Sequence, residues 1–80
     1  PDVPDELTEQ FAAAYGLTAR ERHIVQEVAS SGNLRASAEA LEISYETLRS
    51  HMKNVYEKTN FRTLSDVIQA VRTGDLSNLL

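Results

Sequence analysis

Residues 44–59 read SYETLRSHMKNVYEKT and contain polar side chains that could contact the base edges of DNA. Arg49 and Lys53 are four residues apart, so in a helix they lie one turn apart on the same face and can reach the same groove. Arginine and lysine donate hydrogen bonds to guanine O6 and N7, and a good bidentate contact gives about 1–3 kcal/mol of discrimination between bases. Glu46 could accept a hydrogen bond from cytosine N4, or pair with Arg49 or Ser50 instead.

The negative net charge of the chain disfavours contact with DNA, whereas the distribution of its charges favours it. The formal net charge is -4, which argues against indiscriminate attraction to nucleic acid. Four acids and no base fall in the first ten residues: Asp2, Asp5, Glu6 and Glu9. Residues 44–63 carry four bases and two acids, a balance of +2. The segment with the candidate base contacts is therefore mildly positive within an acidic chain.

The length and composition indicate one small domain. A chain of 80 residues with 41% hydrophobic content buries only a modest fraction of its surface, so a large catalytic cleft is not expected. The longest apolar stretches have three or four residues, too few for a membrane-spanning segment or the core of a signal peptide. We therefore expect a cytoplasmic domain without a membrane partner.

The composition gives no sign of catalysis. The chain has no cysteine, and its two histidines, His23 and His51, fall on different expected helices. Its three glycines form no phosphate-binding loop. We expect that the protein is not an enzyme and that the domain holds no cofactor, metal or small-molecule ligand.

The apolar periodicity is helical throughout, which predicts an all-α chain of about four or five helices. The first helix is predicted over roughly residues 6–15, with Asp5 as N-cap and an apolar face made by Leu7, Phe11 and Ala14 or Tyr15. A short helix is predicted over roughly residues 34–41. The helix ends are marked by capping or stop chemistry: Thr18 with Glu21 as a capping box, Asn33, Ser44 and Thr63 as N-caps, and Gly16, Gly32, Asn60 and Gly74 as stops.

The two helices on either side of Glu42 and Ile43 are predicted to form a helix-turn-helix. So short a link forces the helices to cross sharply. In this arrangement the second helix, about residues 45–59, enters the major groove, while the first crosses the DNA backbone. The inward positions of the second helix are Leu48, Met52 and Val55, and its outward positions are Glu46, Arg49, Ser50, Lys53, Asn54 and Glu57.

The side chains around this face also have ordinary structural interpretations. Mixed charge on a helix usually marks a solvated surface, and the Ser44 hydroxyl is better explained as a cap than as a phosphate contact. Thr47 and Arg35 are candidate phosphate contacts. Tyr45 and Tyr56 are expected at the edges of the core.

The segments LTARERHIV, VASS and LEISYETLRSHMKNVYEKT resemble the LuxR/NarL (GerE-like) DNA-binding domain, whose pattern reads roughly LTxRExxV, VAxG, LxISxxTVKxHLxNIxxKL. The resemblance runs without a gap from Leu17 to about Val71. It implies a four-helix LuxR-type bundle over residues 17–74, preceded by an acidic segment with a short helix, residues 1–16, and followed by a tail, residues 75–80. It also implies sequence-specific DNA binding, as a dimer, in a bacterial transcriptional regulator.

The resemblance assigns roles to individual residues. Base contacts are expected at Arg49, Ser50 and Lys53. Thr47, His51 and Asn54 fall where backbone or structural roles are usual, and Arg35 and Lys58 are further bases within reach of phosphates. Dimer contacts are expected on the last helix, at Leu64, Val67, Ile68 and Val71.

Members of this family often carry the domain after a sensor, phosphoacceptor or ligand-binding part, as in response regulators. Because the chain starts at Pro1 and not at Met, we expect it to be processed or to be part of a longer protein. The expected partners are double-stranded DNA and a second copy of the chain, with RNA polymerase as a further candidate.

Several residues depart from the family pattern. Ser31 stands where a glycine is usual, with Gly32 one place later, and Ser37 stands where an apolar residue is usual. These departures predict a differently shaped turn and looser packing beneath the recognition helix. Further departures are Arg35, Ala36, Asn60 and Leu64; Leu64 could enlarge an apolar dimer surface or fill the core.

Two other functions fit the same residues. The first is a protein-interaction module that uses the acidic N-terminus and the last helix and does not bind DNA strongly by itself. The second is a domain like sigma-factor region 4, which shares the helix-turn-helix and docks on RNA polymerase. Charge reversal at Arg49 and Lys53 distinguishes the first alternative, because it should abolish DNA binding and leave a protein complex intact.

Overall fold

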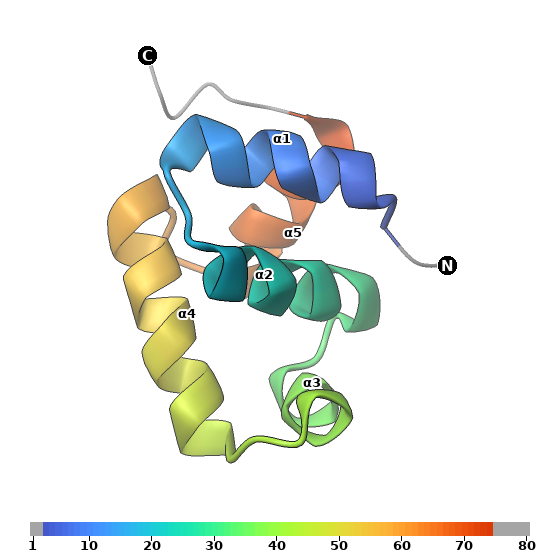
Figure 1. Cartoon of the computed structure of the whole chain (residues 1–80), viewed down its shortest axis with the longest axis vertical. Helices are drawn as coiled ribbons and strands as arrows, with labels where there is room; N and C mark the ends of the chain where they lie inside the picture. The colour runs from blue at the N-terminus through green and yellow to red at the C-terminus, as the bar shows by residue number, and fades with distance from the viewer. Residues whose placement is uncertain (1–2, 75–80) are drawn as a thin grey trace.

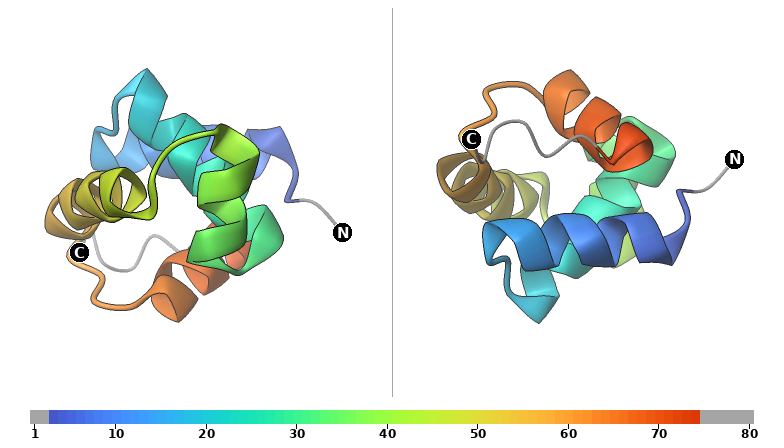
Figure 2. Two further views of the ribbon diagram at one scale, coloured as in Figure 1. Left: turned by 90° about the horizontal axis from the view of Figure 1, so that it is seen from below. Right: turned by 90° about the horizontal axis from the view of Figure 1, so that it is seen from above.

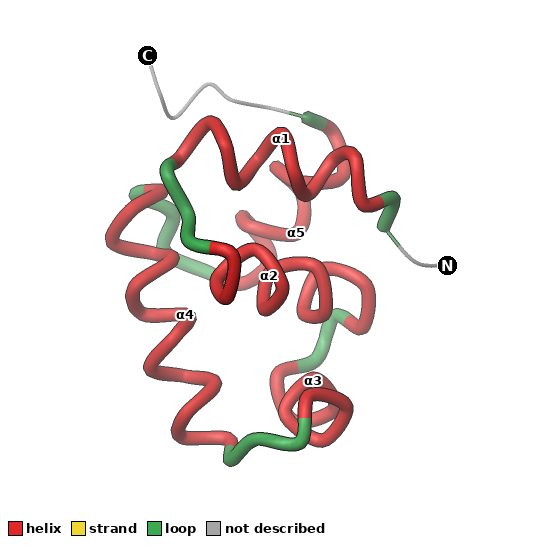
Figure 3. Tube along the Cα trace, in the orientation of Figure 1, coloured by secondary structure: helices red, strands yellow, loops and turns green. Residues whose placement is uncertain are grey.

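The structure is a computed structural model that describes residues 3–74, and over these residues it contains helices and loops alone (Figures 1 and 3). The helices are α1 (Asp5–Tyr15), α2 (Ala19–Ser31), α3 (Leu34–Leu41), α4 (Tyr45–Thr59) and α5 (Leu64–Thr73). The prediction of an all-α chain with an additional N-terminal helix is confirmed. The expected tail, residues 75–80, and Asp2 lie outside the described residues.

Side-chain caps begin four of the five helices, as predicted. Thr18 and Glu21 form a reciprocal capping box at the start of α2. The side chains of Asn33, Ser44 and Thr63 accept hydrogen bonds from the amide three residues later, at 2.9, 3.0 and 3.2 Å. These bonds satisfy amides that have no partner within the helix, and so they fix where each helix begins.

The predicted cap of α1 was wrong. Pro4 holds the N-cap position without a side-chain hydrogen bond, and Asp5 is the first helical residue. A carboxylate in the first helical turn still interacts favourably with the helix dipole, which explains why Asp5 fits one position later.

Helix α2 is the centre of the core. Its residues Ile24, Val25, Val28 and Ala29 have no exposed surface, and the helix contacts each of the other four helices. Views from below and from above show the other helices placed around it (Figure 2). The apolar side chains buried against α2 come from every neighbour, including Phe11, Ala38, Leu48, Met52, Val55, Val67 and Val71.

Helix α1 packs on α2 and α5 through a face that shares Phe11 and Tyr15 with the predicted one but contains Thr8 in place of Leu7. Its buried residues are Thr8, Phe11, Ala12 and Tyr15, whereas Leu7 and Ala14 are only half-buried. Sequence periodicity favoured Leu7 because it is more apolar than Thr8. Burial of Thr8 is accommodated by a hydrogen bond from its hydroxyl to the Gln26 side chain.

Further contacts attach both ends of α1 to the body of the domain. At the start, Gln26 Nε2 donates to the Val3 carbonyl at 2.6 Å, and the Val3 amide donates to Ser30 Oγ at 3.2 Å. At the end, the rings of Phe11 and Tyr15 lie 6.2 and 5.9 Å from that of Phe61 in the α4–α5 loop. These contacts make α1 an integral part of the fold.

Helices α3 and α4 form the predicted helix-turn-helix, with α3 seen end-on in Figure 1 and α4 running along the side of the molecule. Glu42 ends α3 in the left-handed conformation, with φ 57° and ψ 42°, and its amide donates to the carbonyls of Ala38 and Glu39. This conformation turns the chain within three residues, which brings Ser44 into position to cap α4. Glu42 is strained in this conformation, because a residue with a Cβ is disfavoured at positive φ.

The two serines that depart from the family pattern lie next to each other. Ser37 is fully buried, and its Oγ is 2.6 Å from Ser31 Oγ and 2.8 Å from the carbonyl oxygen of Asn33. Gly32 takes the left-handed position that ends α2, with φ 72°. The buried serine is therefore satisfied by the turn between α2 and α3.

The left-handed residue between α3 and α4 gives a stability prediction. Glu42→Gly should raise the free energy of unfolding by about 0.5–1 kcal/mol, because glycine adopts positive φ without the steric cost of a Cβ. Urea unfolding followed by circular dichroism measures the change. Glu39→Gly, an exposed site inside α3, is the control and should lower stability by about 1 kcal/mol. A loss of stability in Glu42→Gly would show that its side chain matters more than its backbone.

Candidate nucleic-acid interface

The outward face of α4 carries the predicted base contacts on a rigid support. Leu48, Met52 and Val55 are fully buried, which fixes the rotation of α4 about its own axis. Arg49, Ser50 and Lys53 are exposed on the opposite side. The structure therefore brings the three predicted base contacts together on one accessible surface, which we call the α4 face.

The first turn of α4 is stabilised by a pair of hydroxyls. The Ser44 hydroxyl accepts the Thr47 amide at 3.0 Å and donates to Thr47 Oγ1 at 2.8 Å. Because Thr47 Oγ1 is the acceptor in this pair, its own O–H can donate outward. Thr47 is exposed, as is Asn54 two turns further along the helix. Both predicted backbone contacts are therefore open to solvent.

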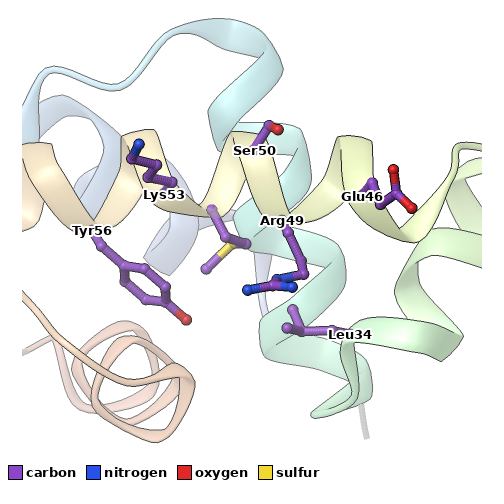
Figure 4. A pocket seen from close by; sticks show the side chains of 7 residues that line it. Leu34, Glu46, Arg49, Ser50, Lys53 and Tyr56 are labelled. Atoms are coloured by element: carbon purple, nitrogen blue, oxygen red, sulfur yellow. The ribbon is translucent and has the colours of Figure 1, made fainter.

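An open groove of about 430 Å³ lies along one side of the α4 face. Its apolar lining comes from Leu34, Met52 and Tyr56, and its polar lining from Glu46, Arg49, Ser50 and Lys53. Figure 4 shows the Arg49 side chain extending from α4 toward Leu34 on α3. Burial raises the pKa of the Tyr56 hydroxyl above its ordinary value of 10.0, so this phenol is neutral at physiological pH.

Arg35 approaches the α4 face from α3. It is exposed, and its Cζ lies 4.3 Å from the centroid of the Tyr45 ring. Arg49 Cζ lies 5.9 Å from the same centroid. A predicted phosphate contact and a predicted base contact thus share one aromatic ring.

Lys58 is engaged in the fold. Its Nζ lies 2.6 Å from Oε1 of Glu21, whose side chain is 7% exposed. Burial by itself raises the pKa of Glu21, but hydrogen bonds from Lys58 and from the Thr18 amide, with the charge of Lys58, outweigh it and lower the pKa below its ordinary value of 4.5. The positive charge of Lys58 is therefore largely matched by a buried carboxylate, which weakens its case as a phosphate contact.

Only part of the predicted apolar stripe on α5 is accessible. Val67 and Val71 are buried in the core, whereas Leu64 and Ile68 are half-buried and face partly outward. A second protein can therefore contact the stripe through Leu64 and Ile68 without opening the fold.

The acidic segment lies far from the start of the α4 face. In Figure 1, α1 is at one end of the long axis, and the turn between α3 and α4 is at the other. The longest dimension of the fold is 34 Å. Exposed charges separated by more than the Debye length, about 8 Å at physiological ionic strength, are largely screened from each other. The acids of α1 are therefore largely screened from the first turn of α4, at the other end of the long axis.

The family model of bacterial regulatory proteins, luxR family, matches residues 15–71. The chain belongs to the luxR family. Helix-turn-helix domains of this family are DNA-binding parts of transcription regulators. The match starts at the last residue of α1, so the remainder of this helix lies outside the family model. Comparisons with curated proteins and with solved structures gave no significant match.

Within residues 3–74 of this luxR-family chain, no helix is long and apolar enough to cross a membrane. In the same part of the chain, no group of three or more histidine, cysteine or acidic side chains is placed to hold a metal ion.

Sequence reasoning missed the position of Tyr45. It was expected at the edge of the core, as was Tyr56, but only Tyr56 is among the half-buried side chains that pack against the core. The spacing of Tyr45 and Arg49, four residues apart on one helix, was a usable signal. The contact with Arg35 depends on how α3 and α4 cross, which no local pattern encodes.

The pair of Glu21 and Lys58 gives a prediction about pH. Lys58→Met should lower the free energy of unfolding at about pH 7 by about 1–2 kcal/mol, because it leaves a buried carboxylate with fewer hydrogen bonds. The stabilisation from a carboxylate with a lowered pKa is present above about pH 4.5 and is lost as the pH falls through the folded-state pKa. The difference between the two proteins should therefore vanish in acid.

Urea unfolding of both proteins across the pH range measures this difference. Lys53→Met is the matched control, because Lys53 is exposed and has no ion-pair partner among residues 3–74. Its effect on stability should be small and nearly independent of pH. A stability difference for Lys58→Met that does not decrease at all between neutral and acidic pH would contradict the assignment.

Proposed function

We propose that this domain binds double-stranded DNA sequence-specifically, with α4 in the major groove. The observation that carries the proposal is the exposure of Arg49, Ser50 and Lys53 on one face of a helix whose other face is fixed in the core. Membership of the luxR family supports it. In a helix-turn-helix, this placement aims the side chains of the second helix at base edges.

The proposed contacts divide into two kinds. Arg49 and Lys53 donate to guanine or to other acceptors in the major groove, and Ser50 accepts or donates beside them. Arg35, Thr47 and Asn54 contact phosphates and fix the position of the domain along the duplex. Lys58 is the weakest of the predicted phosphate contacts, because it is paired with Glu21.

The affinity of one copy should be modest. Few bases are available near the α4 face of each copy, and electrostatic affinity for DNA grows with the number of phosphates neutralised. We propose that two copies bind together through α5, with Leu64 and Ile68 in contact and Val67 and Val71 supporting them from the core. Half-sites about 34–36 Å apart would then lie on one side of the duplex.

In this proposal, residues 17–74 form the DNA-binding unit of a transcription regulator, which works in the cytoplasm, and residues 1–16 form an added segment. RNA polymerase is a further proposed partner, as it is for many proteins that act beside a promoter. A response-regulator architecture, with a receiver part upstream, is one arrangement that would supply the regulatory signal.

The base contacts can be tested by selection from random double-stranded DNA. The chain should enrich one short motif, and Lys53→Ala should relax the preference at one or two positions and weaken binding about 10- to 100-fold, as expected for one lost base contact. Arg62→Ala is the control, because this exposed arginine lies beyond the opposite end of α4 from Ser44. It should leave the motif unchanged. Failure of the unaltered chain to enrich any motif would favour a protein-interaction module.

The role of α5 can be tested with DNA that carries one or two half-sites. Ile68→Glu should reduce the preference for two half-sites over one by at least about tenfold, because a charge at the contact prevents joint binding. Gln69→Glu places the same charge on an exposed neighbouring position of α5 and should have little effect. Fluorescence anisotropy at several salt concentrations gives the affinities. Equal affinity of the unaltered chain for both DNAs would contradict joint binding.

A further inference from the structure

Tyr45 is a half-buried aromatic residue that does not pack against the core. It is the first residue of α4, directly after the Ser44 cap, and it is absent from the aromatic and aliphatic side chains that pack against the core. Its ring contacts Arg35 and Arg49, with Cζ to centroid distances of 4.3 and 5.9 Å. Both distances fall within the range of about 6 Å for attraction between a cation and an aromatic ring.

The two arginines reach this ring from different helices. Arg49 is one turn after Tyr45 on α4, the spacing at which side chains of one helix meet. Arg35 comes from the first turn of α3, so its contact with Tyr45 spans the turn of the helix-turn-helix. Within residues 3–74, neither guanidinium has a carboxylate at ion-pair distance. The ring of Tyr45 is therefore the electrostatic contact that the described residues supply to both guanidinium groups.

Contact with the ring leaves the arginines able to bind DNA. A guanidinium group is planar, so it can lie over a ring while its N–H groups point outward in its plane. A free arginine on the surface would lose much of its rotamer freedom on binding, and a side chain already held in place loses less. A ring that holds two arginines thus lowers the entropic cost of both contacts.

We propose that Tyr45 is a positioning residue that holds Arg35 and Arg49 in place for simultaneous contact with DNA. The inference rests on the proposed DNA-binding function. Tyr45 acts through the face of its ring and not through its hydroxyl. It links a phosphate contact from α3 to a base contact from α4, so the two helices act on DNA as one unit.

The ring contact is tested first in the free chain by nuclear magnetic resonance. Protons of the Arg35 side chain should be shifted upfield by the ring of Tyr45. Tyr45→Leu should abolish this shift, whereas Tyr45→Phe should keep it. Urea unfolding of both variants should show stability close to that of the unaltered chain, because Tyr45 does not pack against the core. Absence of any upfield shift in the unaltered chain would overturn the inference.

Affinity for the selected DNA site is measured next. Tyr45→Leu should weaken binding about three- to tenfold, and Tyr45→Phe should bind like the unaltered chain. In the background of Arg35→Ala, the same Tyr45→Leu change should have a clearly smaller effect, because one of the two arginines that it positions is already gone. A purely structural role for Tyr45 would give no such dependence on Arg35.

The outcomes separate this inference from the proposed function. If the unaltered chain enriches no DNA motif, the proposed function fails and the role of Tyr45 fails with it. If the unaltered chain binds its motif and Tyr45→Leu binds equally well, DNA binding stands and the positioning role is overturned. An equal loss in Tyr45→Phe would show that the hydroxyl contacts DNA directly, which also overturns it.

Discussion

The burial of α2 among the other four helices is the constraint on which the α4 face depends. Because Ile24, Val25 and Val28 have no exposed surface, every neighbour must turn an apolar stripe toward them. For α4, this requirement places Leu48 and Met52 inward. The helical period of 3.6 residues then determines which side chains point outward. The direction of the polar face is thus a consequence of core packing.

The two ends of α4 are fixed by different interactions. At its start, the left-handed Glu42 and the cap formed by Ser44 determine how the helix leaves α3. At its end, Lys58 pairs with Glu21, the same residue that completes the capping box of α2. This pair connects the beginning of α2 to the end of α4, and the link occupies a cation that could otherwise have contacted DNA. In the proposed complex, Lys58 would therefore contribute less to DNA binding than an unpaired lysine.

Much of the fold could be predicted from the sequence because it depends on local chemistry. The features that could not be predicted depend on tertiary contacts. Caps such as Thr18 and Asn33 act on amides three residues away, so a short window contains all that is needed. The pair of Glu21 and Lys58 joins residues 37 positions apart, and the contact of Arg35 with Tyr45 depends on a crossing angle. The candidate base contacts were accessible to prediction because helical spacing alone places them together.

Helix α1 does not line the groove beside α4, but it packs against the helix that carries the proposed dimer contacts. It packs on α5, whose Val67 and Val71 are buried, and leaves Leu64 and Ile68 partly exposed. Two half-exposed apolar side chains form a small contact compared with the roughly 800 Å² per partner of a stable interface. Self-association through this face is therefore expected to be weak in solution and to be strengthened when DNA holds two copies side by side.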